Sequence, residues 1–395
     1  MQFPERFSDL PPYAFPRLRA LLDGHAAGGT PLHMSIGEPR HPMPGFVAET
    51  LAEAMDGFAK YPANDGTPEL LAAITGWIGR RYGVTLAEDR VLALNGTREG
   101  LYNAAMALCP ETKGGRTPTV LMPNPFYQVY AVAALSVGAE PVFLPATEQT
   151  GHLPDLDAIP AETLDRAALF YLCSPSNPQG AVATEAYWAR LLELAERHDF
   201  RVLADECYSE IYRDTAPPGL LPAAEKAGAD PDRVLAFHSL SKRSNLPGLR
   251  SGFVTGGGGN IGAMRRLRAY AGAPLPNPLQ AVAARVWTDE AHVARNRALY
   301  AEKYREADAI LAGVPGYKGP EAGFFLWLPV PDGEAAATAL WRETGVRVLP
   351  GAYLGRDAGA GNPGVGYIRV ALVAPIDEMR RGLTLIRGCL YGDED

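Results

Sequence analysis

The chain has 395 residues, a formal net charge of -8 and 21% charged residues, which is typical of a large globular protein. The acidic balance and the lack of a basic cluster argue against a nucleic-acid partner. The first residues show no basic segment followed by an apolar one, and no run of about 18 apolar residues occurs, so neither export nor a membrane partner is predicted. The 4 cysteines are scattered without C-x-x-C spacing, which argues against a disulfide framework or a zinc site and favours a cytoplasmic location.

Residues from about 65 to 270 alternate between apolar, strand-like runs and helix-like segments. In chain order the runs are RVLAL (90–94), TVLMP (119–123), AALFYLCSP (167–175), RVLADE (201–206), RVLAFHSL (233–240) and SGFVTG (251–256). Continuous apolar strands separated by helices are typical of a mostly parallel sheet with both faces covered. We therefore predict a large α/β domain.

Two further regions flank this domain. A Pro-rich, aromatic arm (Phe3 to Pro16) precedes it and a helical segment (Pro278 to Ala312) follows it. The runs AGFFLWLPV, GVRVLPG and GYIRVALV are then typical of short strands in a small α+β domain. We predict an N-terminal arm and part of the small domain over residues 1–40, a large domain over 41–285 and a small C-terminal domain over 286–395.

Polar residues follow several of the apolar runs, at the strand ends where open α/β sheets bind ligands. Gly96, Thr97 and Arg98 open a helix whose free N–H groups favour a phosphate, with a Thr97 helix cap as the alternative. Tyr127 follows the next run and is either a ring-stacking residue or a core aromatic. Asn177 lies in SPSNPQG, which by composition is a turn-rich loop.

Charged residues within apolar runs need partners. Asp205 ends RVLAD and pairs either with a structural cation or with the protonated nitrogen of a ligand, and Tyr208 follows it closely. Arg369 lies inside GYIRVALV and pairs either with a structural carboxylate or with a substrate carboxylate.

The stretch SLSKRSNLPGLRSG places Lys242 between Ser239 and Ser241 and close to Arg250. A lysine near another cation has a lowered pKa, as a Schiff-base nucleophile needs, although a lone lysine is more often on the surface. Together with a phosphate-type loop, an aromatic ring and a strand-end aspartate, this set describes pyridoxal phosphate as the ligand. Gly257-x-Gly259-x-x-Gly262 fits a dinucleotide fingerprint superficially, but no acidic residue ends a strand about 20 residues later. We therefore interpret GGGG (256–259) as a loop.

The motifs NGTRE, SPSNPQG, DECYSEIY, SLSKRSNLPGLRSG and YIRVAL together resemble those of class I/II aminotransferases of pyridoxal-phosphate fold type I, in the same order and over nearly the whole chain. The resemblance implies an α/β fold with a large pyridoxal-phosphate-binding domain, whose mostly parallel sheet lies between helices, and a small α+β domain. It implies three catalytic residues: Lys242 would bond to the cofactor aldehyde, Asp205 would hold the ring nitrogen protonated, and Tyr208 would contact the phenolic oxygen.

The resemblance also implies the other contacts. Further cofactor-binding residues would be Gly96, Thr97, Arg98, Ser239, Ser241 and Arg250 around the phosphate, Tyr127 on the ring face and Asn177 at the phenolic oxygen. Arg369 and Asn177 would bind the substrate, with the loop SIGEP at Gly37 closing over it. Tyr61 matches a tyrosine that reaches the phosphate of the neighbouring subunit, which implies a homodimer with shared sites.

Within the family, LNGTREGLY, PFYQVY, DECYSEIY and FHSLSKRSNLPGLRSGF are most similar to bacterial succinyldiaminopimelate transaminases. That similarity implies glutamate as the amino donor and the oxo acid N-succinyl-2-amino-6-oxopimelate as the acceptor in lysine biosynthesis. An aminotransferase for aspartate or an aromatic amino acid, or a carbon–sulfur β-lyase on the same scaffold, is the alternative. A ligand-sensing regulator is disfavoured because no basic helix-turn-helix segment precedes residue 40.

Overall fold

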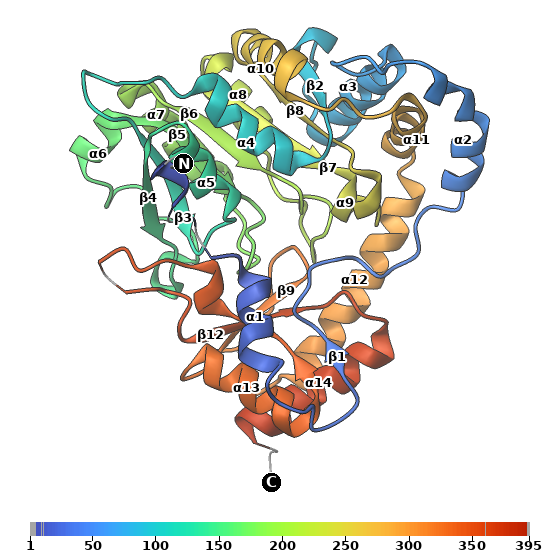
Figure 1. Cartoon of the computed structure of the whole chain (residues 1–395), viewed down its shortest axis with the longest axis vertical. Coiled ribbons are helices and arrows are strands. Elements are labelled where there is room, and N and C mark those ends of the chain that lie inside the picture. The colour runs from blue at the N-terminus through green and yellow to red at the C-terminus, as the bar shows by residue number, and fades with distance from the viewer. Residues whose placement is uncertain (1–4, 9, 11, 360, 393–395) are drawn as a thin grey trace.

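The structure is a computed structural model that describes residues 5–8, 10, 12–359 and 361–392. Phe3, Pro4, Asp9 and Pro11 of the expected N-terminal arm lie outside the described residues. The chain forms a larger part around one wide sheet and a smaller part that contains the C-terminus (Figure 1). Among the described residues, no helix is both long and apolar enough to cross a membrane.

The wide sheet has seven strands in the order β2-β8-β7-β6-β5-β3-β4. Their bounds are β2 Val91–Leu94, β3 Thr119–Asn124, β4 Glu140–Pro145, β5 Ala167–Cys173, β6 Arg201–Asp205, β7 Val234–Ser239 and β8 Gly252–Gly256. Strand β8 is antiparallel to β2 and β7, whereas the other neighbours pair in parallel. The mostly parallel sheet predicted from the apolar runs is confirmed.

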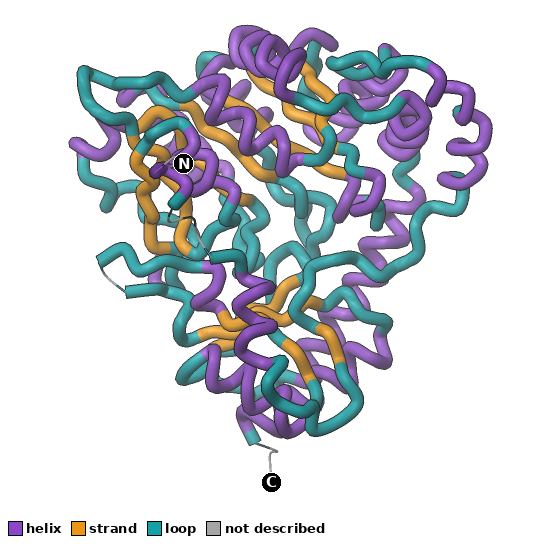
Figure 2. The backbone as a smooth tube through the Cα atoms, in the orientation of Figure 1, coloured by secondary structure: helices purple, strands orange, loops and turns teal. Residues whose placement is uncertain are grey.

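Helices cover both faces of this sheet (Figure 2). Phe170 and Leu172 of β5 pack into the core beneath one group of helices, whereas Leu169 and Tyr171 pack into the core on the opposite face. The first group contains α3 Pro68–Tyr82, α7 Glu185–His198, α8 Leu220–Ala227 and α11 Asn277–Thr288, and the second contains α4 Thr97–Leu108, α5 Val129–Ser136 and α10 Gly258–Ala271. Shorter helices are α2 Val47–Glu53, α6 Ala161–Arg166 and α9 Leu240–Arg243. Because side chains on both faces of the sheet are buried, the sequence of each strand is a continuous apolar run.

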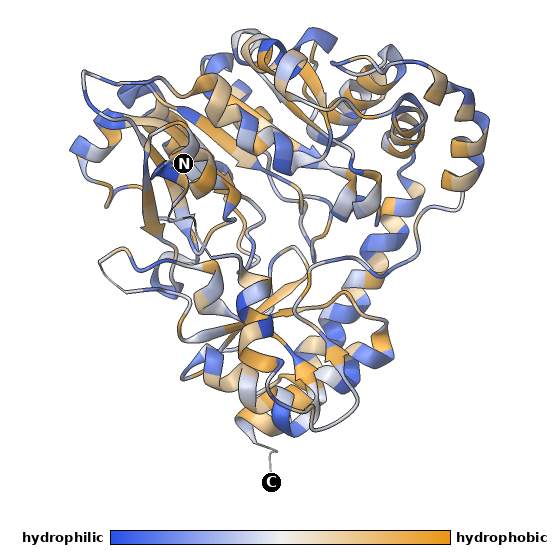
Figure 3. Cartoon of the chain, viewed as in Figure 1, coloured by the Kyte–Doolittle hydropathy of each residue, from blue (hydrophilic) through white to orange (hydrophobic). Residues whose placement is uncertain are grey.

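The smaller part joins the C-terminal third of the chain to residues near the N-terminus. Its strands are β1 Leu32–His33, β9 Phe325–Pro329, β10 Val346–Arg347, β11 Leu349–Pro350 and β12 Tyr367–Ala371, and its helices are α1 Ala14–Leu22, α13 Gly333–Thr344, α14 Ile376–Tyr391 and α12 Ala291–Ile310. Strand β1 pairs with β10, and β12 lies between β11 and β9. Apolar residues concentrate on these central strands, as on the wide sheet (Figure 3). We propose that the two parts are the domains 41–285 and 286–395, with residues 1–40 joining the latter.

The segment around GGGG corrects one sequence interpretation. Gly257 is the cap of α10, and the helix itself begins at Gly258, so these glycines are not a loop. A β-carbon on Gly257 would lie 2.0 Å from an oxygen of Asp232, whose carboxylate accepts the N–H of Asn260. Close packing of this aspartate against the start of the helix, rather than a flexible connection, explains the small residues.

Candidate active site

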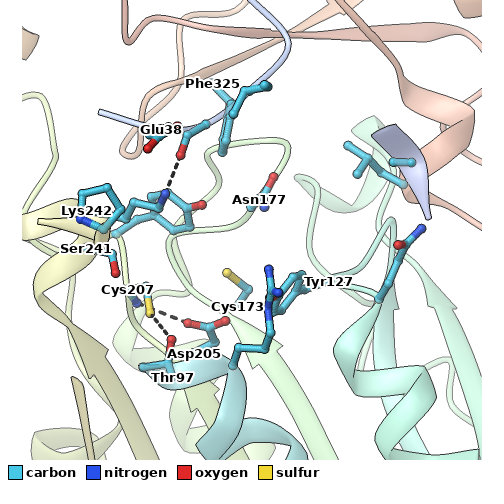
Figure 4. Close-up of a pocket in the computed structure, with 18 of the residues that line it drawn as sticks. Glu38, Thr97, Tyr127, Cys173, Asn177, Asp205, Cys207, Ser241, Lys242 and Phe325 are labelled. Carbon is cyan, nitrogen blue, oxygen red and sulfur yellow. Dashed lines mark hydrogen bonds between the residues drawn. The ribbon is translucent and has the colours of Figure 1, made fainter. Parts of the chain in front are cut away.

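A cavity of about 380 Å³ lies between the two parts of the chain, at the carboxyl ends of the parallel strands. Lys242, Asn177, Tyr127 and Asp205 surround a common space in it (Figure 4). The sequence-predicted residues that line the cavity are Gly37, Thr97, Arg98, Tyr127, Asn177, Asp205, Tyr208, Ser239, Ser241, Lys242, Arg250 and Arg369. Segments from most of the chain length therefore meet in one place.

Lys242 lies on the short helix α9, directly after strand β7. Its Nζ donates a hydrogen bond to the carbonyl oxygen of Gly37. Burial lowers the pKa of Lys242 to about 8, and the nearby Arg369 and Arg250 act in the same direction. The lysine is thus an interior amine that loses its proton far more readily than a surface lysine.

Asp205 ends strand β6 and is 6% exposed. Its Oδ2 accepts a hydrogen bond of 2.8 Å from the Tyr130 hydroxyl, and its Oδ1 accepts one of 3.4 Å from the backbone N–H of Cys207. Burial raises the pKa of its carboxyl group. Because no lysine or arginine in the described part of the chain forms an ion pair with it, Asp205 is not a member of a structural salt bridge there.

A polar cradle forms where α4 and α9 begin. Gly96 caps α4 with φ 82°, so Thr97 is the first helical residue and not the cap. The Ser239 hydroxyl donates to the Ser241 hydroxyl at 2.9 Å. A β-carbon on Gly96 would lie 2.2 Å from a guanidinium nitrogen of Arg250, which places this cation against the loop. Hydroxyls, the N-terminus of α4 and one arginine together suit a phosphate group.

Arg369 projects from β12 and is 5% exposed. Its guanidinium donates to Asn177 Oδ1 at 2.9 Å and to the carbonyl oxygen of Ser35 at 2.8 Å, and it lies 4.1 Å from the centre of the Phe325 ring. Burial lowers the pKa of Arg369 to about 10. These neighbours orient the arginine toward the cavity but do not neutralise it, which leaves its charge for an incoming anion.

Four other predicted residues lie at different places relative to the cavity: three line it and one does not. Tyr208 is 8% exposed at the cavity wall, and Tyr127 accepts a hydrogen bond of 2.8 Å from Arg98 Nε. Arg98 is exposed and points along Tyr127 rather than into the cradle. Tyr61 is fully exposed and does not line the cavity of its own chain.

The chain matches the family described as "Aminotransferase class I and II" over residues 30–384. It belongs to that family. The aminotransferase is 33% identical over 392 residues to an LL-diaminopimelate aminotransferase of Dehalococcoides mccartyi, with 97% of each chain covered. The crystal structure of an aminotransferase from Neisseria meningitidis superposes with a TM-score of 0.93 at 38% identity, covering 98% of this chain and 100% of that one. A probable N-succinyldiaminopimelate aminotransferase from Thermus thermophilus gives a TM-score of 0.83 at 27% identity, with coverage of 95% and 100%.

Class I and II aminotransferases use pyridoxal phosphate, and the residues present in this aminotransferase fit it. An aldehyde-binding amine has to be buried and readily deprotonated, as Lys242 is. A pyridinium nitrogen needs a carboxylate that is not already paired, and a phosphate needs a cradle such as the one beside Arg250. The predicted aminotransferase activity and cofactor are confirmed by the family.

Several cavity residues of the aminotransferase were not predicted from the sequence. They are Tyr13, Phe15, Ile36, Glu38, Phe126, Gln128, Cys173, Cys207, Pro247, Phe325, Leu349 and Leu354, together with Ala14. Glu38, Phe126 and Cys207 lie in the motifs SIGEP, PFYQVY and DECYSEIY, but spacing along a motif does not indicate which side chain points into a cavity. Leu349 lies on the short strand β11 and Leu354 ends a 3-10 helix, Gly351–Leu354, and the sequence carries no signal that places either side chain at a cavity.

Proposed function

We propose that this aminotransferase moves an amino group from glutamate to N-succinyl-2-amino-6-oxopimelate in diaminopimelate and lysine biosynthesis. The names of the Dehalococcoides and Thermus proteins, which contain diaminopimelate and N-succinyldiaminopimelate, support this branch of metabolism. Glutamate carries two carboxylates and the proposed acceptor carries three, and in each an α-carboxylate and a distal carboxylate lie at opposite ends of the molecule. They therefore share the need for a site that receives a carboxylate at each end.

The observation that carries the proposal is the pair of cations Arg369 and Arg98 in one cavity. Arg369 is buried and Arg98 is exposed, and neither forms an ion pair with a carboxylate of the described residues. A diacid satisfies both, with its α-carboxylate on Arg369 and its distal carboxylate on Arg98. Arg98 would then bind the distal carboxylate of the substrate in addition to the cofactor, which is the contact expected for it from the sequence.

Pyridoxal phosphate, when bound, supplies an electron sink for the charge that develops at the substrate Cα. Lys242 would hold its aldehyde carbon, Asp205 its ring nitrogen and Tyr127 its ring face. Asn177 and Tyr208 would contact its phenolic oxygen. The phosphate contacts would come from Gly96, Thr97, Ser239, Ser241 and Arg250.

Lys242 would also move the proton in the transfer, after the amino group of the substrate has displaced it and left its amine free. A group with a pKa near 8 is partly unprotonated at neutral pH, so the amine of Lys242 can take the proton from the substrate Cα as a general base. Gly37 contributes its carbonyl oxygen as a hydrogen-bond acceptor for this amine. Arg369 fixes the α-carboxylate so that the Cα–H bond faces the lysine.

We also propose a homodimer with shared sites, located in the cytoplasm. Tyr61, Phe58 and Tyr270 are exposed apolar residues of the larger part, as expected for a surface that a second subunit covers. Tyr61 lies outside its own cavity, which agrees with a contact to the phosphate of the partner. The four cysteines are all free thiols, which supports a reducing compartment.

LL-diaminopimelate itself is the second candidate substrate, because the Dehalococcoides relative carries that name. The test is a spectrum of the purified enzyme before and after adding glutamate without acceptor. Loss of the visible band of the lysine-bound cofactor, followed by its return on adding an oxo acid, measures each half-reaction separately. Return with the succinylated acceptor supports the first candidate, and bleaching by LL-diaminopimelate without return by the succinylated acid supports the second. No bleaching by any diacid contradicts both.

Replacement of Arg98 tests the diacid assignment. In Arg98→Gln we expect kcat/KM for glutamate to fall about tenfold to a hundredfold, because a charged hydrogen bond contributes about 1.5–3 kcal/mol. The rate with alanine, which has no distal carboxylate, should change little. Arg369→Lys is the matched variant and should slow both amino acids. Equal losses for glutamate and alanine in Arg98→Gln would remove the distal-carboxylate role.

A further inference from the structure

Asp205 carries a buried carboxylate whose hydrogen bonds come only from neutral groups in the described part of the chain. The Tyr130 hydroxyl donates to Oδ2 at 2.8 Å, whereas the backbone N–H of Cys207 lies 3.4 Å from Oδ1. The tyrosine therefore makes the shorter contact, with the carboxylate oxygen that the loop backbone does not engage. A hydrogen bond to a charged acceptor inside a protein is stronger than the same bond in water.

Tyr130 is held in place by its surroundings. It lies on α5 and is fully buried, and its ring stacks on that of Tyr171 with a centroid distance of 4.6 Å and an interplanar angle of 8°. Tyr171 is anchored from β5 by its own hydroxyl, which donates to the carbonyl oxygen of Leu101 at 2.7 Å. A stacked, buried ring cannot swing its hydroxyl away from Asp205, so the donor is oriented before any ligand arrives.

We infer that Tyr130 is a positioning residue that orients Asp205 and keeps it ionised toward the ring nitrogen of the cofactor. The inference rests on the proposed contact between Asp205 and that nitrogen. Tyr130 itself does not line the cavity, so it acts through the carboxylate. Among the residues that the structure describes, no other side-chain hydroxyl donates to Asp205.

The expected effects follow from stabilisation of the anion. Loss of the Tyr130 hydroxyl makes the Asp205 carboxylate more basic, so the proton shared with the ring nitrogen shifts toward the aspartate. The ring then carries less positive charge, binds less tightly and withdraws electrons less strongly. The other titratable groups that face Asp205 are Tyr127, Cys173, Glu206, Cys207, Tyr208 and Lys242, and they are unchanged by the substitution.

The chain offers a matched pair of variants, Tyr130→Phe and Tyr171→Phe. Each deletes one buried hydroxyl from the same stack, but only the first touches Asp205. For Tyr130→Phe we expect the equilibrium dissociation constant of pyridoxal phosphate from the apoenzyme to rise about tenfold to a hundredfold. We also expect kcat to fall while KM for glutamate changes little. Tyr171→Phe should leave the cofactor affinity and kcat near the wild-type values.

The visible absorbance of the bound cofactor distinguishes a positioning role of Tyr130 from a general loss of structure around the site. Positive charge on the ring nitrogen opposes protonation of the nearby lysine nitrogen. Loss of that ring charge in Tyr130→Phe should therefore raise the pH midpoint of the visible band. Tyr171→Phe should keep the wild-type midpoint. Thermal melting of each apoenzyme checks that both variants fold.

The variant Asp205→Asn separates failure of this inference from failure of the proposed site. If Asp205→Asn binds the cofactor like the wild type, Asp205 does not hold the ring nitrogen and the proposed site is wrong. If Asp205→Asn is impaired but Tyr130→Phe behaves like Tyr171→Phe, only the inference is overturned. If Tyr130 acts through Asp205, adding Tyr130→Phe to Asp205→Asn should have no further effect on cofactor affinity, whereas an additive loss contradicts it.

Discussion

Lys242 and Arg369 show how one environment gives two cations different chemistry. Both lie in the same cavity, and burial lowers the pKa of Lys242 to about 8 and that of Arg369 to about 10. At neutral pH the arginine therefore stays charged and suits an anion, whereas the lysine yields a useful fraction of free amine. Arg369 and Arg250 also lower the pKa of Lys242 by repulsion, so an arginine without a carboxylate partner beside Lys242 supports both roles.

The lowered pKa of Lys242 predicts the pH dependence of cofactor capture. Only the neutral amine attacks an aldehyde, so the rate at which apoenzyme captures pyridoxal phosphate should rise about tenfold per pH unit at low pH. The rise should level off near pH 8, the pKa of Lys242, and not near its ordinary value of 10.5. Stopped-flow absorbance over this pH range measures the profile.

The variant Arg369→Met supplies the control for that profile. Removing a nearby positive charge favours protonation of Lys242, so the levelling-off point should move to higher pH. A wild-type rate that is still rising at pH 10, or an unshifted profile in the variant, contradicts the argument.

At the scale of elements, the phosphate cradle depends on how α4 and α9 begin. Strands β2 and β7 end at neighbouring points of the sheet on either side of β8, and each is followed closely by a helix. The N-termini of these helices therefore face the same region. Gly96 lets the chain turn into α4 with φ 82° while the guanidinium of Arg250 lies against it.

Gly96→Ala should raise the dissociation constant of the cofactor as well as lower the free energy of unfolding. The added β-carbon requires Arg250 to move, and loss of one charged contact to the phosphate should raise the cofactor dissociation constant about tenfold to a hundredfold. Gly138 is a matched control, because it has φ 73° and open space where a β-carbon would go. Both variants carry the cost of a positive φ, and this cost is larger for Gly96→Ala because φ 82° with ψ 153° is a region that is essentially restricted to glycine.

Fluorescence titration of each apoenzyme with pyridoxal phosphate, together with urea unfolding, distinguishes the two effects. We expect both variants to lose stability, Gly96→Ala more than Gly138→Ala, but only Gly96→Ala to bind the cofactor more weakly in its folded state. Unchanged affinity in Gly96→Ala would mean that Arg250 does not contact the phosphate.

Predictions from the sequence agree best with the structure at the buried strands of the sheet and at their carboxyl ends. The apolar strands and the residues at their carboxyl ends, such as Asp205 and Lys242, could be predicted because burial and position in a parallel sheet constrain them. The contact of Tyr130 could not be predicted, because the sequence around it does not reveal that its hydroxyl, on α5, lies next to Asp205 at the end of β6. The prediction of a loop at GGGG is wrong, because glycine content alone cannot distinguish a loop from a tightly packed helix start.

The whole molecule brings together residues that are hundreds of positions apart. Arg369 of β12 donates to Asn177 of the larger part and to the carbonyl oxygen of Ser35 near the N-terminus. The cavity therefore exists only when the two parts are packed together, and a change in their packing alters the position of Arg369. Tyr61 remains outside this arrangement, which makes it the residue that tests the assembly of two subunits.

Mixed dimers decide whether Tyr61 acts on the neighbouring subunit. In one heterodimer, Lys242→Ala and Tyr61→Phe are placed on different subunits, and in the other both changes are on the same subunit. Each heterodimer retains one Lys242, so cofactor reports on one site. If Tyr61 reaches across, the first heterodimer pairs its lysine with an intact partner tyrosine and should bind cofactor like the wild type. The second pairs its lysine with phenylalanine and should bind it about tenfold more weakly, by loss of one hydrogen bond to a charged group. The opposite order would place Tyr61 in the site of its own subunit, and equal affinities would remove it from the phosphate site altogether.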